Sequence, residues 1–111
     1  MVNPEELVAG VDMHRHPTAL ALATELVWQA GKLRDTRETI DENQMAPVIS
    51  YDNGGGQTGI RRNPLYDAYN SLFAQFTRGC AQLDSILADT PASTNAKGAL
   101  ASLRVVAGRS A

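Results

Sequence analysis

A glycine-rich stretch, SYDNGGGQTGIRRNP at residues 50–64, is the first place where the sequence suggests chemistry. Its Gly54, Gly56 and Gly59 spell G-x-G-x-x-G, the pattern of a dinucleotide-binding turn. Such a turn needs a second parallel strand with an acidic residue about 20 positions further on. Here Asp84 falls inside a predicted helix instead, and the stretch has no Gly-Lys-Ser/Thr phosphate loop. We therefore interpret the glycines as a turn and expect no cofactor.

Histidine and cysteine side chains are the other candidates for chemistry. Asp12, His14 and His16 alternate on a short connector and offer three potential metal ligands, although alternate residues on a connector are more often solvated. Cys80 is the only cysteine, so no intrachain disulfide can form. It lies on the apolar stripe of a predicted helix, where a buried thiol is inert. Because no Ser-His-Asp or Cys-His arrangement is present, we expect no metal and no enzymatic activity.

Basic side chains gather in the second half of the chain. Residues 1–60 hold nine acidic and four basic side chains, whereas residues 61–111 hold three acidic and six basic ones. Two adjacent arginines precede a predicted helix start, where backbone N–H groups also favour anions. The candidates for contacting DNA phosphates are Arg61, Arg62, Lys97, Arg104 and Arg109. The alternative interpretation is that each is an ordinary solvated side chain.

Size and composition limit the kind of protein. The chain has 111 residues and a mass of 11.9 kDa, so it forms one domain at most. Its net charge of -2 differs from the positive net charge that is typical of a dedicated nucleic-acid-binding domain. The start has no basic segment followed by an apolar run, and no stretch approaches the length of a membrane span. We expect a soluble, cytoplasmic protein with no membrane partner.

Hydrophobic spacing and capping residues predict a mainly α fold. We expect two long antiparallel helices joined by a short β-hairpin, with a short N-terminal helix and a weak C-terminal helix. Residues 1–17 form the lead-in helix and connector, and residues 90–111 form the tail or weak helix. The helical hairpin spans residues 18–89, with the β-hairpin at about 47–62.

The apolar faces predict both internal packing and self-assembly. The inward stripe of the first long helix is expected to pack on that of the second, pairing Leu22, Leu26, Leu33 and Ile40 with Leu65, Leu72, Phe76 and Leu83. Two residues of the first helix lie off this stripe, and the first hairpin strand adds apolar side chains. The candidates for oligomerisation are Val27, Trp28, Ile49 and Tyr51.

The order of these elements resembles the small subunit of phage terminase, in its short helical-hairpin family. That family has a glycine-containing segment ending in Asn-Pro between two long helices, and a Thr-Pro-Ser type element after the second. The corresponding residues here are glycines 54–56, Asn63 with Pro64, and Thr90 with Pro91 and Ser93. The resemblance covers roughly residues 20–97. The short lead-in and the overall acidity depart from the family, which often carries DNA-binding elements before the first helix.

The resemblance implies a non-enzymatic DNA-packaging factor of the bacterial host cytoplasm. Such a factor forms a homo-oligomeric ring, binds double-stranded viral DNA near the packaging start and presents it to the large terminase subunit. The alternative is a small interaction or inhibitor protein, encoded by a prophage, that binds a protein target through the hairpin and never contacts DNA.

Overall fold

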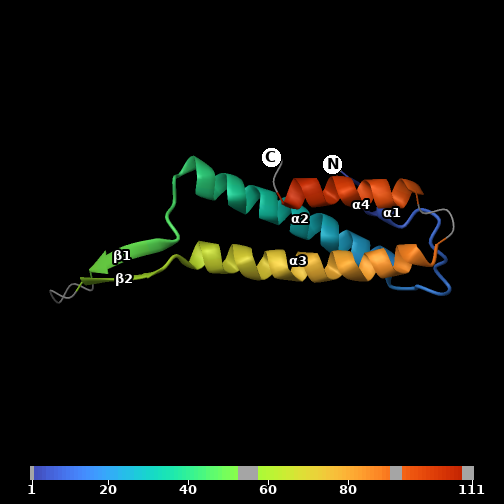
Figure 1. The fold of residues 1–111 in the computed structure, drawn as a ribbon, viewed down its shortest axis with the longest axis horizontal. Helices are drawn as coiled ribbons and strands as arrows, with labels where there is room; N and C mark the ends of the chain where they lie inside the picture. The colour runs from blue at the N-terminus through green and yellow to red at the C-terminus, as the bar shows by residue number, and fades with distance from the viewer. Residues whose placement is uncertain (1, 53–57, 91–93, 109–111) are drawn as a thin grey trace.

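The computed structural model describes residues 2–52, 58–90 and 94–108 of the chain. Its elements follow one another as α1 (Pro4–Leu7), α2 (Ala19–Glu42), β1 (Val48–Asp52), β2 (Thr58–Arg62), α3 (Pro64–Ala88) and α4 (Thr94–Ala107). The helices lie together as one elongated body, and the two short strands extend from one end of it (Figure 1). Among the described residues, no helix combines the length and apolar character needed to cross a bilayer.

The predicted fold class, two long antiparallel helices joined by a β-hairpin, is wrong as a description of this fold. The folded body is mainly helical and is made of four helices, and within the described residues no sheet forms part of it. Residues 48–52 and 58–62 pair only with each other, in an antiparallel register that sets Val48 opposite Arg62. An isolated two-stranded ribbon of this kind adds little stability of its own.

The expectation of a weak C-terminal helix is also corrected. α4 runs for 14 residues in spite of Gly98. Its inward side chains are fully or almost fully buried against α1 and α2, namely Ala96, Leu100, Leu103 and Ala107. Burial of this apolar stripe outweighs the low helix propensity of the segment, because most helical stability in proteins comes from tertiary packing.

Both long helices begin and end close to where the sequence placed them. α3 starts at Pro64 after Asn63, whose side-chain oxygen accepts a hydrogen bond from the Leu65 N–H at 3.0 Å. The Asn63 amide also donates to the Ala46 carbonyl at 3.0 Å, and its backbone N–H donates to the Pro47 carbonyl at 2.8 Å. One residue therefore caps the helix and fixes the path of the chain that precedes β1.

The core lies where α2 crosses α3 and α4. α2 buries small residues and leucines on one side, while α3 buries Phe76, Cys80, Leu83 and Leu87. At the crossing, a Cβ added to Gly79 would lie 2.6 Å from the Leu26 Cδ2 atom. Only glycine lets the two helices approach this closely.

Away from this crossing, polar contacts also connect α3 to α2 and to the segment that follows α2. The Arg37 guanidinium donates to the Tyr69 hydroxyl at 2.8 Å and to the Gly108 carbonyl at 3.3 Å, which links α2, α3 and the end of α4. The Tyr66 hydroxyl donates to the Met45 carbonyl at 2.7 Å. Leu65 and Leu72 stay partly exposed, so the predicted continuous pairing of leucine stripes is correct only near the crossing.

The resulting shape is long and thin. Its extents are 64 × 25 × 16 Å and its radius of gyration is 18.2 Å. A compact domain of this length would have a radius of gyration of about 13 Å. Part of this difference comes from the strands, which extend from one end of the helical body (Figure 1).

A matched pair of glycine substitutions tests the close crossing. Gly79→Ala adds a Cβ against the buried Leu26 side chain. Overpacking of about 1–3 kcal/mol then exceeds the gain of about 1 kcal/mol in helix propensity. In Gly98→Ala, nothing lies within 4 Å of the new Cβ, so only the gain in helix propensity remains. In urea unfolding, we expect Gly79→Ala to lower the free energy of unfolding and Gly98→Ala to raise it; a stabilised Gly79→Ala variant would contradict the crossing.

The cap at Asn63 gives a second test. Asn63→Ala removes the acceptor for Leu65 N–H and the donor to Ala46. We expect the free energy of unfolding to fall by about 1–2 kcal/mol, as for other lost N-caps. Asn63→Asp keeps the acceptor and should recover part of this loss in the same thermal or urea unfolding measurement. Equal losses in both variants would show that the cap does not stabilise α3.

Candidate functional site

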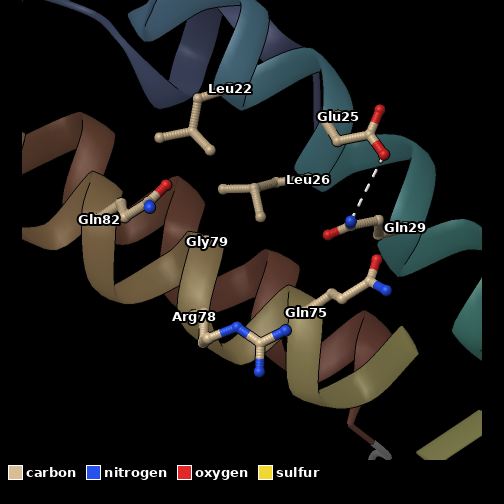
Figure 2. Close-up of a pocket in the computed structure, with 8 residues that line it drawn as sticks. All are labelled: Leu22, Glu25, Leu26, Gln29, Gln75, Arg78, Gly79 and Gln82. Carbon is tan, nitrogen blue, oxygen red and sulfur yellow. Dashed lines mark hydrogen bonds between the residues drawn. The ribbon is translucent and has the colours of Figure 1, made fainter. Parts of the chain in front are cut away.

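A polar groove lies at the crossing of α2 and α3. It has a volume of about 230 Å³ and is lined by Leu22, Glu25, Leu26, Gln29, Gln75, Arg78, Gly79 and Gln82. Figure 2 shows the α2 side chains above it and those of α3 below, with Gly79 contributing only backbone. The helix crossing that Gly79 permits therefore also creates this groove.

Gln29 is the unusual residue of the groove. It is only 6% exposed, although its neighbours on the apolar stripe of α2 are hydrophobic. Its Nε2 atom donates to the Glu25 carboxylate at 3.4 Å, but its Oε1 atom is buried without a hydrogen-bond partner. A buried polar atom without a partner costs about 1–3 kcal/mol. Within the folded chain, the Gln29 amide therefore forms a hydrogen bond through its Nε2 atom alone.

The groove offers several polar groups that can bind a ligand. They are one carboxylate, one guanidinium and three amides, which donate and accept hydrogen bonds. Sequence reasoning did not identify these residues. A glutamine at position 29, three residues after Leu26 and four before Leu33 on the apolar stripe, is the signal that could have revealed the groove.

The structure does not bring the candidate DNA-binding residues together. Arg61 and Arg62 belong to β2 at one end of the molecule, whereas Lys97 lies on the first turn of α4 at the other end (Figure 1). The side chains of Arg61 and Arg62 lie outside the part of the structure that is described, as does the whole of Arg109. No single basic patch forms from the described members of this set.

Arg104 is engaged with α3. Its guanidinium donates to the Asp84 carboxylate at 2.5 Å, and both side chains are about half exposed. The same guanidinium approaches the Cys80 thiol. Burial raises the pKa of Cys80 above its ordinary value, and the Arg104 charge offsets this only in part. A thiol of raised pKa is a poor nucleophile at neutral pH.

The residues that the sequence suggested for metal and nucleotide binding lie away from the groove. Asp12 and His16 line a separate cavity of about 180 Å³ with Arg15, Asp89 and Thr90, near the end of α3. Within the described ranges, no three His, Cys, Asp or Glu side chains are arranged to hold a metal ion. Of the glycine pattern, Gly59 lies in β2, while Gly54 and Gly56 lie outside the described residues.

The candidates for oligomerisation differ in their surroundings. Trp28 is 54% exposed, with the Lys32 ammonium 5.7 Å from the centre of its ring. Val27 is partly buried against the core. Ile49 and Tyr51 belong to β1, and their side chains are not described.

In comparisons with known proteins, the chain matches no protein-family model, no curated protein and no solved structure.

Replacing Gln29 tests whether the groove carries a destabilising side chain. Gln29→Met keeps the length of the side chain and removes the unpartnered Oε1 atom. We expect the free energy of unfolding to rise by about 1 kcal/mol in urea denaturation. The control is Gln82→Met, an exposed groove residue that should change it little. A destabilised Gln29→Met variant would mean that the amide finds a partner within the folded chain.

Proposed function

We propose that this chain is a non-enzymatic subunit of a homo-oligomeric assembly that handles DNA during phage packaging, as a terminase small subunit does. In this proposal the ring binds double-stranded DNA in the bacterial host cytoplasm and passes it to the large terminase subunit. The resemblance of residues 20–97 to the short helical-hairpin family suggests the biological setting.

The incomplete core of the chain supports the assembly part of the proposal. Several large apolar side chains stay exposed on the helices: Leu20 is 41% exposed, Trp28 54%, Phe73 37% and Val105 56%. The radius of gyration of the whole chain, strands included, is 18.2 Å. We infer that neighbouring copies cover these exposed side chains, as large apolar patches at the surface mark sites of protein interaction. This exposure is the observation that carries the proposal.

The DNA-binding part of the proposal depends on positive charge supplied by several copies of the chain. One chain has a net charge of -2 and separated basic residues, so a single copy would bind phosphates weakly. A ring repeats Arg61 and Arg62 once in every subunit, and multiple weak contacts act together when the subunits are linked. Both arginines directly precede Asn63 and the N-terminus of α3, where backbone N–H groups add to the attraction for anions.

The alternative function is a prophage-encoded interaction protein that binds a protein target through the hairpin. Residues 48–52 and 58–62 extend from the helical body, which gives such a partner access to the strands (Figure 1). The two functions differ in DNA affinity and in its dependence on salt.

Mass measurement with a DNA titration tests the proposal. We expect light scattering at tens of micromolar to give a mass several times 11.9 kDa. Affinity for duplex DNA should fall as salt rises, because each phosphate contact releases counterions. Arg61→Ala with Arg62→Ala should reduce both the affinity and the salt slope, while the control pair Arg15→Ala with Arg78→Ala, two exposed arginines, should change them less.

Two results separate the alternatives. A monomer at all concentrations would contradict the assembly part of the proposal. An oligomer without salt-dependent DNA affinity would contradict the DNA part and favour the interaction protein.

A further inference from the structure

The only tryptophan of the chain points away from its own core. Trp28 lies two residues after Leu26 and two before Ala30, and both of these are buried. At about 100° per residue, this spacing sets Trp28 on the opposite side of α2. The indole is 54% exposed, and Lys32 approaches one face of its ring. A large apolar side chain is thus presented on the outer face of α2.

A cavity with two aromatic rings in its lining lies between α3 and α4. It has a volume of about 190 Å³ and is lined by Phe73, Phe76, Thr77, Cys80 and Arg104, which we call the α3–α4 socket. Phe76 and Cys80 are buried at its base, whereas Phe73, Thr77 and Arg104 are exposed. Pockets for drug-sized ligands are larger, roughly 300–1,000 Å³. The socket has the size of a side chain.

The socket and Trp28 lie on opposite faces of the molecule. α2 packs against both α3 and α4, which contact each other less. The groove between α3 and α4, with its exposed Thr77 and Arg104, therefore opens away from α2. Both faces lie on the helical body, in which α2 is about 36 Å long and α4 about 21 Å. A stable interface buries roughly 800 Å² per partner, so the contact extends beyond Trp28 and the socket to the helices around them.

We propose that Trp28 of one copy occupies the α3–α4 socket of the next copy, an inference that rests on the self-assembly proposed above. The indole would pack on the Phe73 and Phe76 rings. Asp84 holds the Arg104 guanidinium at the socket, where it can lie over the indole face that Lys32 leaves free. Because the two surfaces differ, the contact is heterologous and repeats from copy to copy until the ring closes.

Charges on the two faces set the direction of this contact. Asp35, which also pairs with Arg34 at 3.3 Å, follows Trp28 by seven residues on the same side of α2. Lys97 precedes Arg104 by seven residues on the same side of α4. Seven helical residues span about 10.5 Å. With α2 of one copy antiparallel to α4 of the next, Trp28 reaches the socket and Asp35 reaches Lys97. Such exposed charges contribute to orientation more than to affinity.

Matched hydroxyl positions on α3 provide the first test. The exposed Thr77 and Ser85 hydroxyls each donate to the carbonyl four residues earlier, but only Thr77 lines the socket. We expect Thr77→Lys to shift the oligomer midpoint, measured by light scattering over a dilution series, to at least tenfold higher concentration. Ser85→Lys should leave it unchanged. Trp28→Ala should act like Thr77→Lys, whereas Met13→Ala, an exposed apolar residue of the connector, should not.

Mixing the two defective variants gives the decisive test. Each variant retains one intact surface, since Thr77→Lys keeps Trp28 and Trp28→Ala keeps the socket. A mixture should form dimers although neither variant assembles alone. Because only the Thr77→Lys chain has a tryptophan, its emission should shift to the blue when Trp28→Ala is added. Circular dichroism of each variant confirms that it is folded; if Thr77→Lys fails to fold, Thr77→Glu replaces it.

The outcomes separate this inference from the proposed function. If the unaltered chain is monomeric at every concentration, self-assembly and the socket contact both fail. If it assembles but Thr77→Lys and Ser85→Lys have equal midpoints, or the mixture shows no emission shift, the socket contact is wrong while self-assembly stands.

Discussion

The close crossing of α2 and α3 at Gly79 determines much of the remaining structure. The backbone of α3 approaches Leu26 so nearly that no side chain fits between them. This contact holds the N-terminal half of α2 against the C-terminal half of α3, and α4 also packs against α2. Apolar burial is concentrated in that region, where Leu26, Leu83 and Leu103 are almost wholly buried.

The same crossing has consequences for the rest of the surface. Near it, the helices leave a polar groove beside Gln29. Further along, Arg37 of α2 donates a hydrogen bond to Tyr69 of α3, Tyr66 donates to the Met45 carbonyl beyond the end of α2, and Phe73 stays partly exposed. The chain therefore has a well-packed centre and incompletely buried apolar surface around it. Such a structure is more stable when other copies cover that surface, because apolar area removed from water contributes about 25 cal/mol per Å².

The sequence was most informative where local signals and packing agreed. Asn63 followed by Pro64 marked the start of α3 because capping depends on neighbouring residues alone. The sequence predicted only a weak helix at α4, because the stability of this helix comes from contacts with distant residues. These contacts outweigh the low helix propensity of Gly98. The fold class was wrong because the β-hairpin was made part of a fold that is mainly helical. The apolar stripe of α2 was also assigned wholly to α3, whereas α1 and α4 contact α2 as well.

Functional residues were harder to predict than helices. Charge and position suggested Arg61, Arg62 and Lys97, but the fold sets Lys97 far from the other two (Figure 1). The α3–α4 socket combines Phe73 with Arg104, which are 31 residues apart, so no local pattern could indicate it. For Trp28, only the exposed position is confirmed, and it was predictable because a position off the apolar stripe follows directly from helical periodicity.

Direct imaging of the assembled protein by electron microscopy tests the central claim, that identical copies complete one another's surface through unlike faces. The account predicts closed rings in which the outer face of α2 in each subunit meets the α3–α4 face of the next. Particles of a single copy, or two-fold dimers in which like faces meet, would contradict it.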